Sequence, residues 1–184
     1  MNYFFRLRNA LSLFTCLLVA LTVSAQTSGY TASGSFFTTS IGEYEVKDCL
    51  IMLKPAQGGS RSLAMWLFNN PLTEAQRQQY SQAAQLPEGV LEVSLELDQR
   101  ASYLSVKRIR GGGFAFRNLK GGFGGGSLPF VYGSTTRPAD NFKLNLGGTL
   151  EAGSPVHANL TITDDSKMVV VRCKLKCSGP LIVK

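Results

Sequence analysis

Hydrophobic and polar residues alternate one by one along four stretches of the chain. The clearest stretch is residues 91–98, where every second residue is Leu or Val and the residues between them are Glu, Ser or Asp. The same period of two recurs at residues 142–146, 156–163 and 169–176. Because successive side chains of a β-strand point to opposite faces, this period indicates strands with one face buried and the other in water.

Three other segments are predicted to be strands from their composition. Residues 35–41 are rich in Phe and Thr, residues 43–53 end in an apolar run, and residues 63–68 are apolar throughout and contain the only Trp, Trp66. Strands that follow one another without helices between them predict an antiparallel, all-β fold. We expect a single-domain antiparallel β-sandwich, with a β-barrel as the alternative.

One helix is predicted, near residues 73–85. Thr73 is suited to the N-cap, Glu74 and Gln76 suit the first turn, and no Gly or Pro interrupts the segment before residues 87–89. Few of its residues are apolar. We therefore expect a short helix on the surface of the fold.

The first 25 residues have the pattern of a secretory signal peptide. Two arginines, Arg6 and Arg8, precede a mostly apolar stretch at residues 11–23, and small residues follow up to Ala25. The apolar stretch is shorter than the ~20 residues that cross a bilayer, so no transmembrane segment is expected in the mature chain. The sequence therefore predicts cleavage near Ala25 and a secreted or periplasmic protein. Residues 26–34 are expected to be a flexible lead-in, and residues 35–184 a single β-rich domain.

Basic residues are concentrated in a glycine-rich stretch, residues 107–126. The whole chain has a formal charge of +7, but residues 26–99 carry eight acidic and four basic residues, whereas residues 100–143 carry eight basic residues against Asp140 alone. In the folded chain, the acidic residues of the first region either pair with the basic residues of the second or leave them as a basic surface. We expect two glycine-hinged loops, with a short strand at Phe114–Phe116 between glycine turns. Together they would form a flexible basic rim made of Lys107, Arg108, Arg110, Arg117 and Lys120.

The candidate partners of this rim are anionic: a glycan, a lipid headgroup or an acidic protein surface. Basic residues interleaved with Phe also occur in nucleic-acid binding segments, but the predicted export separates the chain from most nucleic acid. Nucleic acid is therefore not expected as a partner. The phosphate-binding ending Gly-Lys-Ser/Thr is absent from the sequence.

Three cysteines remain after the signal peptide: Cys49, Cys173 and Cys177. An exported chain favours a disulfide, and an odd number leaves one thiol over. In an extended strand the Cα atoms of Cys173 and Cys177 are about 13 Å apart, beyond the roughly 7 Å that a disulfide spans. We expect Cys49 to pair with Cys173, with Cys177 as the alternative.

No residues combine into a convincing catalytic or metal site. His157 is the only histidine, and the sequence identifies neither a carboxylate nor a nucleophile beside it. Glu43 and Glu45 are about 7 Å apart on one strand face, a spacing compatible with glycosidase carboxylates, but charged residues on such a face are the usual result of half-burial. Asp164 and Asp165 are too few for a calcium site. No metal and no cofactor are expected.

The sequence thus favours an exported, non-enzymatic β domain with a binding or structural role at the cell envelope or outside the cell. Two alternatives stay open. One is a barrel that carries an apolar ligand, with the glycine-rich stretch at its mouth. The other is a carbohydrate-active enzyme that uses Glu43 and Glu45. Asn159 also begins an Asn-Leu-Thr sequon on the outward face of its strand, where a glycan could be attached in a eukaryotic secretory pathway.

Overall fold

A computed structural model describes residues 29–117, 123–128, 142–164 and 171–184. The predicted signal peptide lies outside these ranges. The described chain is mostly β, with one α-helix, α2 (Glu74–Gln82), and two short 3-10 turns, η1 (Gln57–Gly59) and η2 (Val106–Arg108). The strands are β1 (Thr31–Thr38), β2 (Gly42–Val46), β3 (Asp48–Pro55), β4 (Arg61–Phe68), β5 (Leu91–Leu97), β6 (Ile109–Arg117), β7 (Phe123–Ser127), β8 (Phe142–Gly147), β9 (Pro155–Asp164) and β10 (Val171–Val183).

The ten strands belong to one sheet, which is not closed. Its main path runs β2-β1-β10-β3-β4-β5-β6-β7, and β9 and β8 branch from the other side of β10. The strand pairs are antiparallel except one, in which Leu181–Val183 of β10 run parallel to Ile51–Leu53 of β3. The predicted all-β class is confirmed, and this one parallel pair corrects the expectation of a purely antiparallel layout.

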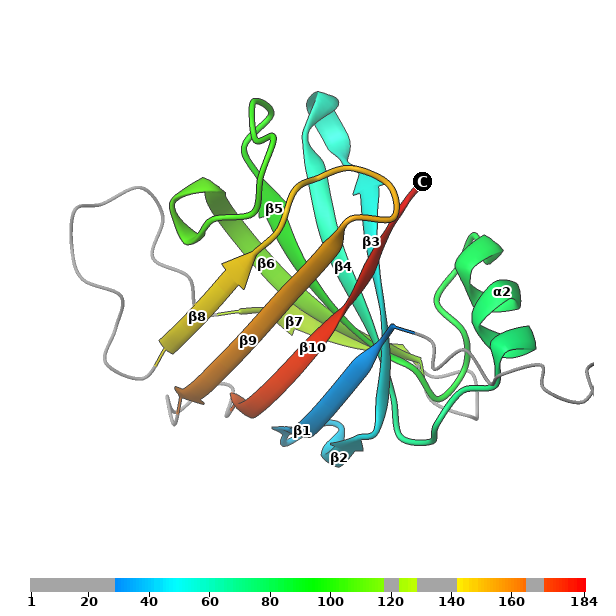
Figure 1. Ribbon diagram of the computed structural model, residues 1–184. Helices are drawn as coiled ribbons and strands as arrows, with labels where there is room; N and C mark the ends of the chain where they lie inside the picture. The colour runs from blue at the N-terminus through cyan, green and yellow to red at the C-terminus, as the bar shows by residue number, and fades with distance from the viewer. Residues whose placement is uncertain (1–28, 118–122, 129–141, 165–170) are drawn as a thin grey trace, which may run out of the picture.

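Strand β10 connects two groups of strands. From Val171 to Pro180 it pairs with β9, and from Val171 to Ser178 also with β1, before its last residues reach β3. In Figure 1, β1, β10, β9 and β8 cross in front of β3 to β7. The inward side chains of both groups form one buried cluster that includes Phe36, Leu95 and Leu160. Each such side chain contributes roughly 1.5–3 kcal/mol by leaving water.

A second buried cluster lies on the other side of β3 and β4. Helix α2 and the loop after it cover Leu50, Met52 and Trp66, and the Phe68 and Tyr80 rings stack with centroids 5.2 Å apart. Because β3 and β4 are buried on both faces, their sequences are apolar runs without alternation. The predicted helix is confirmed, with Thr73 in a capping box with Gln76.

A buried ion pair attaches α2 to the sheet. Arg77 of α2 donates to the Asp48 carboxylate at the start of β3, and this carboxylate also accepts the backbone N–H groups of Cys49 (2.7 Å) and Leu72 (2.8 Å). The Arg77 guanidinium also lies 5.2 Å from the centroid of the Tyr30 ring. This pair holds a helix whose own sequence is nearly all polar.

The structure corrects two predicted boundaries near the N-terminal end. Strand β1 begins at Thr31, inside the segment expected to be a flexible lead-in, because its polar residues pair with β10 along their backbone. Gly34 permits this pairing: its φ is +124°, and a Cβ there would lie 1.8 Å from the carbonyl oxygen of Lys174. The predicted strand at residues 43–53 is two strands, which meet at Lys47.

The glycine-rich stretch is also corrected. The short strand expected at residues 114–116 is part of a longer one, β6 (residues 109–117), and residues 123–127, expected to be a loop, form strand β7. Gly113 of β6 is opposite Ser127 of β7, and a Cβ at Gly113 would lie 2.9 Å from the carbonyl oxygen of Gly126. Glycine here therefore allows the strands to approach closely instead of serving as a hinge.

No helix in the described ranges is long and apolar enough to span a membrane.

Candidate functional site

The structure does not gather the predicted basic rim into one cluster. Arg108 and Arg110 are 3.9 and 3.1 Å from the carboxylate of Asp98. A hydrogen bond from the Arg100 backbone N–H, and then one from Arg110, hold the pKa of Asp98 below its ordinary value. The basic residues at this end of β6 are thus balanced by an acid from the preceding strand region.

Arg117 lies at the other end of β6, about 23 Å from Arg110 along the strand. It is 3.5 Å from the Glu88 carboxylate and donates to the carbonyl oxygen of Leu86 at 3.4 Å. Lys107 is exposed on η2, and Lys120 lies outside the described residues. The rim is therefore divided between two ends of one strand, and most of its described charge is paired.

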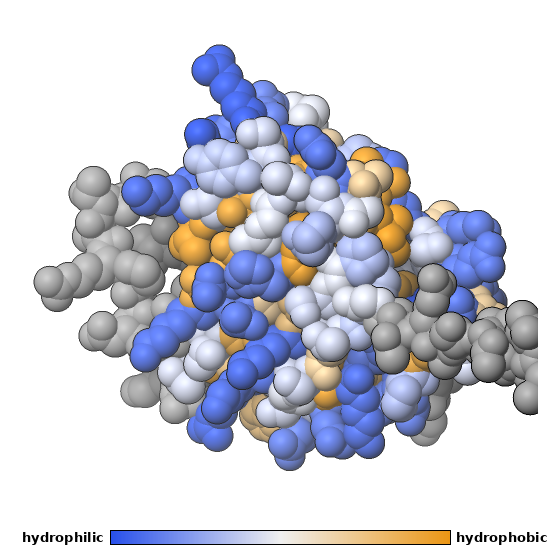
Figure 2. Space-filling view, viewed as in Figure 1, coloured by the Kyte–Doolittle hydropathy of each residue, from blue (hydrophilic) through white to orange (hydrophobic). Residues whose placement is uncertain are grey.

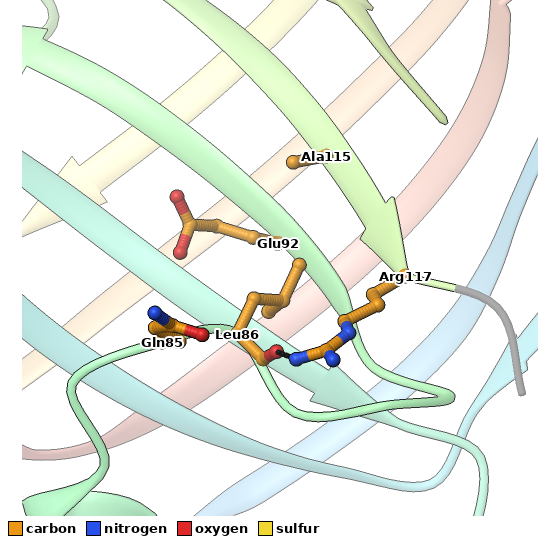
Figure 3. A pocket seen from close by; sticks show the side chains of 5 residues that line it. All are labelled: Gln85, Leu86, Glu92, Ala115 and Arg117. Atoms are coloured by element: carbon orange, nitrogen blue, oxygen red, sulfur yellow. Dashed lines mark hydrogen bonds between the residues drawn. The ribbon is translucent and has the colours of Figure 1, made fainter. Parts of the chain in front are cut away.

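Arg117 also borders a shallow depression of about 400 Å³ between the loop after α2 and strands β5 and β6. Figure 3 shows Leu86 between the Arg117 and Glu92 side chains, which point in different directions. The Glu92 carboxylate accepts hydrogen bonds from Lys54 Nζ and Trp66 Nε1, both at 2.6 Å. Because both charged groups already have protein partners, this depression offers a ligand little unpaired charge.

The two candidate carboxylates lie on an open surface. Glu43 and Glu45 are exposed on β2, and Glu45 is 3.3 Å from Lys47 Nζ. Glu43 borders a depression that Glu45 does not line, so the two carboxylates do not face a common cleft. His157 is exposed on β9, opposite Ser178 of β10. Asp165 and the side chain of Asp164 lie outside the described residues.

The disulfide joins Cys49 to Cys177, with Cα atoms 6.3 Å apart, and Cys173 is the free, buried thiol. The preferred pairing of Cys49 with Cys173 was therefore wrong, and the alternative is the one observed. The parallel register of Leu181 with Ile51 explains this result, because it brings Cys177 close to Cys49. Cys173 is four residues, or about 13 Å, farther along β10.

Exposed lysines without acidic partners lie on the outer side of β8 and β10. Lys174 and Lys176 of β10 and Lys143 of β8 are exposed, and no ion pair found in the described part of the chain includes them. We call these three lysines the basic face. The side of the molecule where β8, β9, β10 and β1 lie in front is covered largely by hydrophilic and neutral residues (Figure 2).

Strand register sets the spacing of the basic face. Lys174 is opposite Thr161 of β9, which is opposite Lys143 of β8, so two strand spacings, about 10 Å, separate these lysines. Lys176 lies about 7 Å from Lys174 along β10. Two unit charges at 7 Å repel by about 0.6 kcal/mol in water. An anion placed among the three lysines would offset this repulsion.

Among the described residues, the acidic side chains that neighbour Lys174 on this side of the sheet lie on β2, two strands away: Glu45, and Glu43, which borders the same depression as Lys174. Ser35 of β1 is opposite both Glu45 of β2 and Lys174 of β10, so about 10 Å separates the strand positions of Glu45 and Lys174. Glu45 is already paired with Lys47. The charges therefore change from mixed at β2 to basic at β10 and β8.

Neutral hydrogen-bonding side chains surround the lysines. The outward positions of β1, β8 and β9 that neighbour them in the register are occupied by hydroxyl and amide groups: Ser33, Ser35, Asn145, Asn159 and Thr161. These groups both donate and accept hydrogen bonds. The arrangement can therefore bind a ligand that combines negative charge with many hydroxyl groups.

The sequence contained a signal for this face. Arg172, Lys174 and Lys176 alternate with inward residues on one strand, which places three cations on a single side of the sheet. Lys143 lies on the same side only because β8 pairs with β9, and no pattern within the sequence of either strand predicts that pairing.

Comparison with known proteins gives no relative: no family model, no curated protein and no solved structure matches the chain.

Proposed function

We propose that the chain is an exported, non-enzymatic β domain that binds an anionic partner through the basic face. The observation that carries the proposal is the set of three exposed lysines, Lys143, Lys174 and Lys176, which form no ion pair with an acidic residue in the described ranges. Exposed charges of one sign are normally interspersed with the other sign on a protein surface, and a patch of a single sign attracts ligands of opposite charge.

The location of the protein rests on two features. The pattern of residues 1–25 favours export, and a disulfide between Cys49 and Cys177 fits an oxidising compartment. A secreted or periplasmic protein meets anionic glycans, lipid headgroups and acidic proteins at the cell envelope. Each of these partners has the charge that the basic face would attract.

A binding role also agrees with the chemistry of the outer strands. Glu43 and Glu45 lie on an open sheet surface, where water would reach a reacting bond freely, whereas glycosidases hold their two carboxylates on either side of the bond.

For the fold, we propose a β-sandwich in which β10 belongs to both groups of strands. The shared cluster of core side chains supports this class over a barrel with an apolar ligand inside.

A pair of matched triple variants tests the proposal. In one, Lys143, Lys174 and Lys176 are each changed to Glu; in the other, Arg100, Lys107 and Arg110 are changed to Glu, which gives the same net charge. Each exported protein is loaded on immobilised dextran sulfate and eluted with salt. We expect the first variant to lose retention and the second to be retained nearly as the unchanged protein is. Equal loss in both variants would mean that net charge alone governs binding and would contradict the proposal.

A further inference from the structure

Three shallow depressions follow one another along the outer side of β10. The first, about 500 Å³, is lined by Arg172 and Lys174. The second, about 330 Å³, is lined by Lys176 and Ser178, and the third, about 570 Å³, by Ser178 and Pro180. Residues 172–180 of an extended strand cover about 26 Å. Together the depressions make a trough much longer than a single anion.

The depressions are connected by shared lining residues and by register. The second and third both include His157 and Ser178. The first and second share no lining residue, but Lys174 borders the first and Lys176 the second, and these lysines are neighbours on the outer face of β10. The trough therefore runs along one strand, with β9 on one side and β1 on the other.

Chemistry changes along the trough. The first part is bordered by Arg172 and Lys174 of β10, by the side chains of Phe37 and Thr161, and by one acid, Glu43 of β2. The second part combines Lys176 with the Asn159 amide. The third part is lined mainly by glycines and prolines, together with His157 and Ser178. Basic groups over the first two parts, hydroxyl and amide groups beside them and a surface of glycines and prolines at one end match a ligand with acidic groups, hydroxyl groups and weakly polar ring faces.

We infer that the trough binds a linear acidic polysaccharide that lies along β10, an inference that rests on the proposed function of the basic face. Lys174 and Lys176 pair with acidic groups of successive sugar units. The hydroxyl and amide groups of β1 and β9 hydrogen-bond the sugar hydroxyls. Lys143, beside the trough on β8, adds attraction at longer range.

The structure favours this ligand over the other two anionic partners. An extended acidic peptide would bind best by adding a strand, but β10 is already paired on both sides over residues 171–178. A flat layer of lipid headgroups would contact the projecting lysines but not the half-buried hydroxyls of Ser35 and Thr161. A narrow polymer reaches both kinds of group.

The test is a series of polyuronate oligosaccharides of increasing length, titrated into the protein by calorimetry. We expect affinity to rise with length until the oligomer covers the trough, and uncharged oligosaccharides of the same lengths to bind far more weakly. Lys174→Gln and Lys176→Gln should each lower affinity about two- to fivefold at every length, whereas Lys107→Gln should not. His157→Ala should weaken long oligomers more than short ones, because His157 lines the second and third parts. All four positions are exposed, and circular dichroism confirms that each variant folds.

Two results would overturn the inference and can be told apart. Binding that depends on Lys174 and Lys176 but does not change with oligomer length, or that occurs with phosphatidylglycerol vesicles and not with oligosaccharides, rejects the trough and leaves the basic face as an anion site. Oligosaccharide binding that neither lysine variant alters rejects the proposed function as well.

Discussion

Replacing Arg77 with methionine removes the only charged contact between helix α2 and the sheet among the described residues. The side chains of Arg77 and Asp48 are 8% and 6% exposed, so the pair is almost fully removed from water. Methionine keeps much of the volume of the arginine stem but cannot neutralise the carboxylate. Asp48 would then be a buried negative charge held by two backbone N–H groups, from Cys49 and Leu72.

The expected cost follows from these contacts. Removing one partner of a buried ion pair destabilises proteins by about 3–5 kcal/mol. Because two backbone donors remain on Asp48, we expect the lower end, about 3 kcal/mol. For a domain of this length that loss lowers Tm by roughly 6–12 °C. A second change, Asp48→Asn, removes the stranded charge, so the double variant should be more stable than the sum of the two losses predicts, by about 1–3 kcal/mol.

Equilibrium unfolding in urea, followed by Trp66 fluorescence, measures these changes. Trp66 is suited to the purpose because it is fully buried beneath the segment that α2 covers. Arg100→Met is the matched control, since Arg100 is exposed, and it should change the free energy of unfolding by less than about 0.5 kcal/mol. A loss below about 1 kcal/mol for Arg77→Met, or strict additivity in the double variant, would refute the view that this pair attaches the helix.

Three further predictions concern export, the free thiol and alkaline pH. The mass of the exported protein should correspond to a chain cleaved between Ala25 and Gln26. Burial raises the pKa of the Cys173 thiol to about 12, so the folded protein should not react with iodoacetamide, while the unfolded, unreduced protein should take up one label. Burial also raises the pKa of Tyr30 and of Tyr44 to about 12, so the folded state binds more protons than the unfolded state between pH 10 and 12. The free energy of unfolding should therefore be unaffected by these groups below pH 10 and decrease as the pH rises from 10 to 12.

For each of these predictions, a specific result would contradict it. An exported chain that retains residues 1–25 contradicts the signal peptide, and labelling of Cys173 at the same rate in folded and unfolded protein contradicts its burial. For the tyrosines, the double variant Tyr30→Phe, Tyr44→Phe should show a flatter decline above pH 10. An unchanged decline would mean that other groups cause it.

The local pattern predicted the strands whose burial is one-sided. Residues 91–97, 142–146 and 156–163 lie in β5, β8 and β9, and the expected side chains that the structure describes there face the core, because a period of two reports directly which side chains face it. The N-cap at Thr73 was predictable for a similar reason, since capping is an interaction within four residues. Such features need no knowledge of distant parts of the chain.

The candidate site depended on distant pairing and was not predictable in the same way. Arg110 could be assigned to a binding rim only while its partner Asp98 was unknown, and the choice between Cys173 and Cys177 turned on where β10 leaves β1 for β3. The strand over residues 109–117 contradicts the low strand propensity of its three glycines, because pairing with β5 and β7 outweighs that preference.

The most direct test of the central claim is a map of ¹H–¹⁵N amide shifts while an acidic polysaccharide is added to the exported protein. The account predicts that shifts concentrate on the outer strands, at residues 33–37, 157–163 and 172–178, and that they diminish when Lys174 and Lys176 are changed to Gln. Shifts centred on residues 107–117, or none at all at saturating polysaccharide, would contradict it.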